Sequence, residues 1–281
     1  MMISARARLA GVMGWPVAHS LSPRLHNFWL ERYRIDGVYV PLPVAPEHFA
    51  QSLRVLAHLG FAGVNITVPH KEAALKAVDQ ADPVARRVGA VNTVMIRRDG
   101  SLYGANTDGA GFVGHLMASV PEFDARAGPA AVIGAGGAAR ALVTALIDAG
   151  VPEIRLSNRT VARAEELATG LGGGVRVINW VDRARALDGT NLLVNATTQG
   201  MVGQKPLVLD LARLPRTAVV YDIVYTPERT PLMAAAAARG NPAIGGLGML
   251  LHQAIPGFKA WFGIKPEVSP ELVDHVRKGL A

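Results

Sequence analysis

Short apolar runs alternate with segments of helical spacing over the first hundred residues. The strand-like runs cover residues 9–14, 38–44 and 61–66. Between them, Ser22–Arg34 and Pro46–Leu59 repeat apolar residues at intervals of three and four, which predicts amphipathic helices. Ser22 suits the N-cap of the first helix and Pro23 its first turn. The amino-terminal part of the chain therefore mixes strands and helices.

A hairpin is predicted near the end of this region. Residues 91–96 and 101–103 are strand-like, and Arg97-Arg98-Asp99-Gly100 joins them. Because an Asp-Gly pair between two such runs favours a tight turn, the two segments should pair antiparallel. The first sheet should then be mixed rather than purely parallel.

A second, more regular alternation starts near Asp108. Its strand-like runs cover 130–133, 153–157, 191–195 and 218–223, and its helical segments include 137–149 and 160–171. Strands that alternate with helices predict a parallel, doubly wound sheet of the Rossmann type. The tail is helical at 249–262 and 270–279, and we expect it to return to the first unit. The chain is thus α/β, with one discontinuous domain of residues 1–108 and 246–281 and a second domain of residues 109–245.

Composition narrows the classes of function. With 281 residues the chain is long enough for two domains or one large one, and because half of the residues are hydrophobic and 18% are charged, it can bury a substantial core. The net charge is +7, but the basic residues are scattered and no basic run is interleaved with aromatic residues, which argues against nucleic-acid binding. The absence of cysteine excludes disulfides, thiolate catalysis and thiolate metal sites.

Neither a metal nor a membrane is expected as a partner. The eight histidines show no ligand spacing. No apolar run reaches the length of a membrane span, and the first residues lack the apolar core of a signal peptide. We therefore expect a cytoplasmic protein. The sequence leaves the oligomeric state open, with a homodimer among the alternatives.

A glycine-rich loop follows the strand Ala130–Ile133. Residues 134–139 read G-A-G-G-A-A and open a helix, which is the context that a dinucleotide-binding loop requires. Gly134 permits the tight turn, Gly136 lets the backbone approach a pyrophosphate, and Ala139 allows close packing of helix on sheet. The free N–H groups of Gly137 and its neighbours at the helix start would bind the pyrophosphate. An unliganded strand–helix turn is the alternative.

The end of the next strand indicates which dinucleotide. An NAD site usually has a carboxylate there, whereas this strand ends in Ser157-Asn158-Arg159-Thr160. Arg159 can form paired, charge-assisted hydrogen bonds with a 2′-phosphate, and Arg163 lies one helical turn later. Asn158 and Thr160 can add polar contacts or simply cap the helix. NADP(H) is therefore favoured over NAD.

Four polar stretches follow the ends of apolar runs. They read H-S-L-S-P (19–23), N-I-T-V-P-H-K (65–71), V-N-T (91–93) and N-T-D-G (106–109). Their hydroxyls, amides, single ammonium and single carboxylate suit a small polyhydroxylated acid. Any one stretch alone is more often a cap or a turn. All four together favour a pocket.

These stretches belong to a longer series of motifs. The series is GWPVAHSLSPRLHN (14–27), NITVPHK (65–71), GAVNT (89–93), GANTDGAGF (104–112), GAGGAAR (134–140), NRT (158–160), NATTQGM (195–201), DIVYTPERTPL (222–232) and GLGMLLHQ (246–253). In this order, over essentially the whole chain, it resembles the shikimate dehydrogenase family. One departure is Thr198, where serine is common in the family.

The resemblance implies an NADP-dependent oxidoreductase that interconverts shikimate and 3-dehydroshikimate, in the pathway to chorismate and the aromatic amino acids. It implies a substrate-binding domain and a Rossmann domain. The implied catalytic pair is Lys71 and Asp108. The implied substrate-binding residues are Ser20, Ser22, Asn65, Thr67, Asn92, Tyr225 and Gln253. The implied cofactor-binding residues are Gly134, Ala135, Gly136, Gly137, Ala138, Asn158, Arg159, Thr160, Arg163, Asn195, Ala196, Thr197, Ile223, Gly246 and Met249.

Reduction of a ketone requires a proton at the developing alkoxide. Lys71 can supply it, and Asp108 can orient the ammonium and hold a substrate hydroxyl. Whether Lys71 transfers the proton or mainly stabilises charge stays open at this point. His70 is expected to have a minor role, because on an extended segment it would point away from Lys71.

Two alternatives remain. One is a quinate dehydrogenase, or an enzyme of broad quinate/shikimate specificity, although Thr67 and Arg159 favour shikimate and NADP. The other is a catalytically silent, NADP-binding regulator on the same scaffold, against which the presence of both Lys71 and Asp108 argues.

Overall fold

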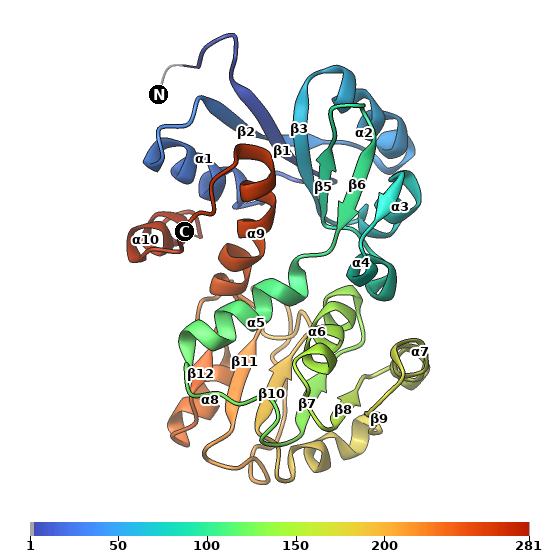
Figure 1. Cartoon of the computed structure of the whole chain (residues 1–281). Coiled ribbons are helices and arrows are strands. Elements are labelled where there is room, and N and C mark those ends of the chain that lie inside the picture. Colours follow the sequence, from blue (N-terminus) through green and yellow to red (C-terminus); the bar gives the residue numbers. More distant parts are fainter. Residues whose placement is uncertain (1–2, 281) are drawn as a thin grey trace. The chain divides into compact units, whose positions relative to one another are not determined.

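The computed structural model describes residues 3–280, and within this range the chain divides into two compact units. The first unit is formed by the chain up to Thr107 together with the chain from Leu251 onward. The second unit is the continuous segment Asp108–Leu250. Each unit is built on its own six-stranded sheet, whose strands can be followed in Figure 1.

The sheet of the first unit is mixed. Its order is β2-β1-β3-β5-β6-β4, formed by β1 (Arg8–Gly14), β2 (Gly37–Pro43), β3 (Phe61–Ile66), β4 (Gln80–Ala81), β5 (Thr93–Ile96) and β6 (Leu102–Ala105). Strand β1 pairs parallel with β2 and β3, whereas β5 pairs antiparallel with β3 and β6. The β5–β6 pair is the hairpin that the Asp-Gly turn predicts. The helical elements are α1 (Ser22–Arg32), η1 (Pro46–His48), α2 (Phe49–His58), α3 (Lys71–Ala77), α4 (Pro83–Val88), α9 (Leu247–Phe262, which belongs to this unit from Leu251 onward) and α10 (Pro270–Arg277).

The ends of helix α1 differ from those predicted from the sequence. Its N-cap is Leu21, not Ser22, and Ser22 is its first residue. The reason is that Ser20 already supplies the side-chain oxygen: its Oγ accepts a hydrogen bond from the Ser22 N–H at 3.3 Å. The helix ends at Arg32 rather than Arg34, because Arg34 adopts a left-handed conformation (φ 54°).

Two apolar clusters hold the first unit together. Leu53 of α2, Val64 of β3 and Leu102 of β6 belong to one cluster and are fully buried. An aromatic cluster of His26, Trp29, Tyr39, Phe258 and Trp261 joins α1 and β2 to α9. Burial of these large side chains supplies the main driving force for folding of the unit.

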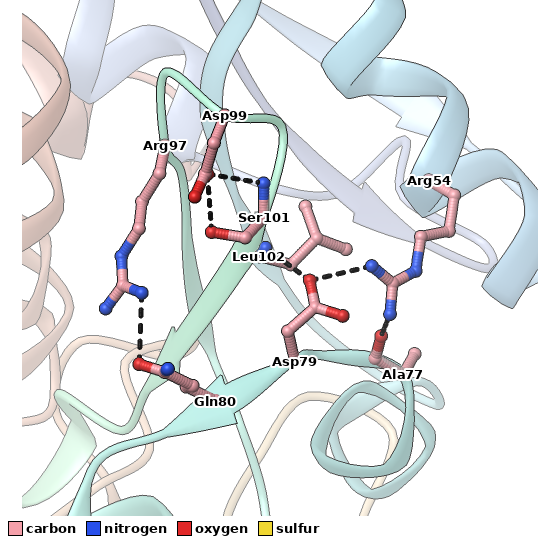
Figure 2. Close-up of polar contacts among 8 residues, drawn as sticks. All are labelled: Arg54, Ala77, Asp79, Gln80, Arg97, Asp99, Ser101 and Leu102. Carbon is pink, nitrogen blue, oxygen red and sulfur yellow. Dashed lines mark hydrogen bonds and ion pairs between the residues drawn. The ribbon is translucent and has the colours of Figure 1, made fainter.

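Hydrogen bonds accepted by two aspartates also hold the β5–β6 hairpin in place (Figure 2). The carboxylate of Asp79 accepts hydrogen bonds from Arg54 Nη1 and from the Leu102 backbone N–H, both at 2.7 Å. At the tip of the hairpin, Asp99 accepts from the Ser101 N–H and hydroxyl at 2.9 and 2.7 Å. These contacts tie the hairpin to α2 and set its turn.

The sheet of the second unit is wholly parallel. Its order is β12-β11-β10-β7-β8-β9, formed by β7 (Ala130–Ile133), β8 (Ile154–Ser157), β9 (Val175–Val177), β10 (Leu192–Asn195), β11 (Val219–Asp222) and β12 (Ala243–Ile244). The helical elements are α5 (Asp108–Ser119), α6 (Gly137–Asp148), α7 (Val161–Leu171), η2 (Trp180–Leu187) and α8 (Pro231–Ala238). Counted within the unit, the strand order 3-2-1-4-5-6 is that of the Rossmann fold. The predicted fold class is confirmed.

Burial explains why the strands of this unit read as plain apolar runs. All four residues of β7, β10 and β11 are buried, because helices cover both faces of a parallel sheet. Strands β9 and β12 have only three and two residues, which is too short for a periodic signal, so neither was predicted from the sequence. Across residues 3–280, no helix has both the length and the apolarity needed to span a membrane.

Candidate active site

A buried polar network runs through the first unit. Asn65, at the end of β3, donates from Nδ2 to the Asn92 carbonyl oxygen (3.2 Å) and to Thr93 Oγ1 (3.1 Å). The Thr93 hydroxyl donates to Asn92 Oδ1 (3.0 Å). Asn92 Nδ2 lies 3.4 Å from Gln253 Oε1, and the Thr107 hydroxyl joins both side chains. Three of the predicted substrate-binding residues, Asn65, Asn92 and Gln253, are thus brought together.

Backbone contacts place the remaining predicted residues of this unit. The Thr67 N–H donates to the Met13 carbonyl (2.9 Å), and the carbonyl of Lys71 accepts from the Val91 N–H (2.9 Å). Ser20 and Ser22 lie at the start of α1, linked by the hydrogen bond described above. Thr67 is therefore attached to β1, and Lys71 to the segment just before β5.

His70 is not on an extended segment, contrary to expectation. It is the helical N-cap residue of α3 (φ −90°, ψ −8°), and Lys71 is the first residue of that helix. The His70 ring is buried, stacks on Phe49 with centroids 4.5 Å apart, and places Nε2 2.7 Å from the Val44 carbonyl oxygen. The ring thus anchors the turn from which Lys71 starts.

The glycine loop of the second unit lies at the switch point of its sheet. Strands β7 and β10 are neighbours, and the loops after them come together at their carboxyl ends. Gly134 has φ 114°, and a Cβ there would lie 2.9 Å from both the Ala196 oxygen and Thr197 Cγ2. A Cβ at Gly136 or Gly137 would meet nothing within 4 Å. The loop is therefore closed on its strand side and open where a pyrophosphate would bind.

The ends of β7 and β8 are joined by an amide. Asn158 Oδ1 accepts from the Ala135 N–H at 3.2 Å, and its Nδ2 donates to the Thr160 carbonyl at 2.8 Å. Arg159 and Arg163 are exposed, and within the described part of the chain neither guanidinium pairs with a carboxylate. Since no carboxylate occupies the end of β8, this corner is cationic. It suits a phosphate better than a ribose diol.

Asn195 organises its loop rather than pointing to an open site. Its Nδ2 donates to the Gln199 carbonyl (3.1 Å) and to Asp222 Oδ1 (2.9 Å). Its Oδ1 accepts from the N–H and the hydroxyl of Thr197 at 3.1 and 2.7 Å. The side chain is completely buried. It holds Thr197 in place and leaves no donor for a ligand.

Asp222 is the centre of this second network. Its carboxylate also accepts from the Val224 N–H (3.0 Å) and from the Thr230 hydroxyl (2.7 Å), and it is fully buried. Burial raises the pKa of Asp222, and the hydrogen bonds from Thr230, Val224 and Asn195 act in the opposite direction. One carboxylate thus ties together the loops after β10 and β11 and the start of α8.

The other predicted residues of the second unit lie on neighbouring segments. The Gly246 N–H donates to the Val224 carbonyl at 3.1 Å, and a Cβ at Gly246 would collide with the Ile223 carbonyl oxygen. Burial raises the pKa of Tyr225. Met249 is half-buried on α9, and Asp108 is the buried first residue of α5. Ala138 lies in the first turn of α6.

Several residues of these networks were not selected from the sequence. Thr93 and Thr107 lie inside the motifs V-N-T and N-T-D-G, so their position was a usable signal. Asp222 likewise opens the motif DIVYTPERTPL (222–232). Tyr39 gave no signal, because it reads as an ordinary member of a strand. Over residues 3–280, no group of three or more His, Cys, Asp or Glu side chains could hold a metal ion.

Comparison with known proteins gives matches along the whole chain. A shikimate dehydrogenase substrate-binding domain matches residues 12–94, a shikimate/quinate 5-dehydrogenase domain residues 120–224, and a shikimate 5′-dehydrogenase C-terminal domain residues 246–270. The NADP(+) shikimate dehydrogenase of Paramagnetospirillum magneticum is 62% identical over 96% of this chain and 98% of its own. The chain belongs to the shikimate dehydrogenase family.

Solved structures of the family have the same fold. Shikimate 5-dehydrogenase from Thermus thermophilus, in complex with NADP(H) and shikimate, aligns with a TM-score of 0.86 and 38% identity over 97% of this chain and 99% of its own. Quinate dehydrogenase from Corynebacterium glutamicum, in complex with NAD, aligns with a TM-score of 0.88 and 28% identity over 97% and 98%. The family is therefore confirmed, and its members include both of the substrate specificities that the sequence left open.

Proposed function

We propose that this protein is an NADP-dependent shikimate dehydrogenase, which reduces 3-dehydroshikimate to shikimate and catalyses the reverse oxidation. The observation that carries the choice of cofactor is the exposed pair formed by Arg159, just after β8, and Arg163, on α7; within the described residues neither is paired with a carboxylate. The high identity to a relative named for NADP(+) supports the same choice. When bound, NADPH would supply the hydride.

Residues of the second unit would hold the cofactor. The backbone N–H groups around Gly136 would bind the pyrophosphate, for which the glycine loop leaves space. Arg159 and Arg163 would bind the 2′-phosphate. Thr197, which Asn195 fixes in place, would border the nicotinamide side together with Gly246. We assign this unit the cofactor and the first unit the substrate.

Residues of the first unit would hold the ring acid. Ser20 and Ser22 would bind its carboxylate, and Thr67, Asn92 and Gln253 its hydroxyls. Asn92 and Gln253 are already oriented against each other, so little side-chain entropy would be lost on binding.

Lys71 and Asp108 are the proposed catalytic pair. Lys71 begins α3 at a turn that the His70 ring anchors, and its ammonium would donate a proton to the oxygen formed from the ketone. Asp108 follows Thr107, whose N–H donates to Asn92 Oδ1 at 2.9 Å. Its carboxylate would orient the lysine and hold a ring hydroxyl.

Two experiments test the proposal. Initial rates with shikimate and with quinate, each with NADP⁺ and with NAD⁺, should be highest for shikimate with NADP⁺. A higher rate with quinate would favour the second candidate, a quinate dehydrogenase, which the quinate-named structural neighbour supports. Oxidation of neither compound despite NADP⁺ binding would favour a regulator.

The second experiment is Lys71→Ala. We expect a strong loss of turnover with nearly unchanged NADPH binding, because Lys71 belongs to the proposed substrate unit. Turnover close to that of the wild type would refute the assignment. A cytoplasmic location and a homodimer also stay predictions, which cell fractionation and light scattering of the purified protein would check.

A further inference from the structure

Tyr39 lies at one end of the polar network in the first unit. Its hydroxyl donates to Asn65 Oδ1 at 2.7 Å, and its side chain is 1% exposed. Burial raises the pKa of Tyr39 well above its usual value, with the Ser22 side chain acting in the opposite direction. The phenol therefore stays protonated and serves as a donor.

The orientations of the two asparagine amides follow from the backbone groups beside them. The Asn92 carbonyl can only accept, so the Asn65 atom beside it is Nδ2 and the atom facing Tyr39 is Oδ1. The Thr107 N–H can only donate, so the Asn92 atom beside it is Oδ1. Asn92 Nδ2 then faces Gln253 Oε1.

Thr93 connects the two asparagines. Its hydroxyl accepts from Asn65 Nδ2 and donates to Asn92 Oδ1 at 3.0 Å. The order of donation is thus Tyr39 to Asn65, Asn65 to Thr93, and Thr93 to Asn92. A hydrogen-bonded chain of this kind fixes one orientation for each amide, because a flipped amide would place two donors or two acceptors together.

The ring of Tyr39 is held independently of its hydroxyl. It stacks on the His26 imidazole with centroids 4.0 Å apart and planes 2° from parallel. The Asn27 side chain binds both the N–H and the carbonyl of Tyr39, at 3.0 and 2.9 Å. Burial lowers the pKa of His26 to about 3, and the Asn65 side chain acts in the opposite direction. His26 is therefore neutral, and its ring can stack on a phenylalanine at position 39 equally well.

We propose that Tyr39 is a positioning residue for substrate binding: acting through Asn65 and Thr93, its hydroxyl holds in place the amides of Asn92 and Gln253 that recognise the ring hydroxyls of the substrate. This inference rests on the proposed function. Because its side chain is buried, Tyr39 itself would not contact the substrate. Without its hydroxyl, Asn65 Oδ1 would be buried without this donor, and Asn65 would hold Thr93, and through it Asn92, less firmly in place.

The test is Tyr39→Phe in the full-length enzyme, assayed with shikimate and NADP⁺. We expect the KM for shikimate to rise about tenfold, since one buried acceptor loses its partner, while the KM for NADP⁺ and kcat change by less than about twofold. Tyr33→Phe is the matched control. Tyr33 also uses its hydroxyl in the first unit, accepting from the Glu267 N–H at 3.0 Å, and its loss should leave both KM values unchanged.

Variants of Thr93 distinguish an effect on substrate positioning from a general loss of stability. Thr93→Val should raise the KM for shikimate, and Thr93→Ser, which keeps the hydroxyl, should restore it. The double variant Tyr39→Phe/Thr93→Val should resemble either single variant, because both interrupt one chain. Independent, additive effects on the KM, or a fall in melting temperature with an unchanged KM for shikimate, would overturn the proposal. If the wild type fails to oxidise shikimate at all, the proposed function fails instead.

Discussion

Thr230→Val would test the network around Asp222 with little change of shape. The Thr230 hydroxyl donates to Asp222 Oδ2 at 2.7 Å and accepts from the Met233 N–H at 3.3 Å as the N-cap of α8. Thr230 is 1% exposed and Asp222 is fully buried. Valine fills the same space, so the change removes two hydrogen bonds from a buried position and creates no large cavity.

The expected cost is large for a single hydroxyl. A hydrogen bond to a charged group contributes about 1.5–3 kcal/mol, and an N-cap contributes about 1 kcal/mol. The free energy of unfolding of Thr230→Val should therefore fall by about 2–4 kcal/mol at pH 7.

The pH dependence of this cost follows from the pKa of Asp222. Burial raises that pKa, and loss of the Thr230 hydroxyl, whose hydrogen bond opposes the shift most strongly, raises it further. A carboxyl with a raised pKa in the folded state destabilises the protein where it is ionised, and this cost vanishes below its unfolded pKa of 3.8. The difference between variant and wild type should thus narrow as the pH falls from 7 towards 4.

Urea unfolding followed by circular dichroism would measure the effect. Thr190→Val is the matched control, because Thr190 is equally buried in the same unit and donates only to the Leu187 carbonyl, at 3.0 Å. It should cost about 1 kcal/mol. We also expect the KM for NADP⁺ to rise in Thr230→Val and not in Thr190→Val. Equal losses of stability in the two variants would refute a special role for the Asp222 carboxylate.

Three further outcomes are expected. Arg159→Ala should raise the KM for NADPH by about tenfold to a hundredfold, as a charge-assisted hydrogen bond is lost, and leave the KM for NADH unchanged. The hydrogen bond from Arg54 lowers the pKa of Asp79 to about 2. The stability that the ionised Asp79 carboxylate contributes is therefore present above pH 3.8 and is lost as the pH falls towards 2. Acid titrations of the unfolding free energy should therefore be flatter in Asp79→Asn over that interval. Gly63→Ala should fail to accumulate as folded protein on expression, because its Cβ would collide with Trp261 Nε1, whereas Gly100→Ala, with φ 81° and no atom within 4 Å, should still fold.

Much of the fold could be predicted from the sequence because two kinds of signal agreed. In the second unit, apolar runs gave β7 and β10, and the glycine pattern after Ile133 independently required a strand before it and a helix after it. Strands β4, β9 and β12 were not predicted, because two or three residues are too few to show the alternation of apolar and polar residues that marks a strand.

Only the polar residues of the candidate site that lie in conspicuous sequence motifs could be predicted. Asn92 and Gln253 lie in motifs whose polar character stands out, and the structure brings them together. Tyr39 could not be found, because a tyrosine in a strand is more often part of the core, and only the contact of its hydroxyl with Asn65 reveals another role. Asn195 shows the reverse case, in which a polar residue inside a recognised motif has all its hydrogen bonds inside the protein.

The division of the chain has a consequence for biosynthesis. The first unit needs its carboxyl-terminal helices: the Trp261 indole N–H donates to the Val94 carbonyl at 3.0 Å in a space that Gly63 leaves open. On the ribosome this unit therefore cannot be completed until the last part of the chain has emerged. The second unit is one uninterrupted segment and can fold earlier. Nascent chains would thus carry an unfinished amino-terminal segment, with an unfilled apolar surface, for most of translation.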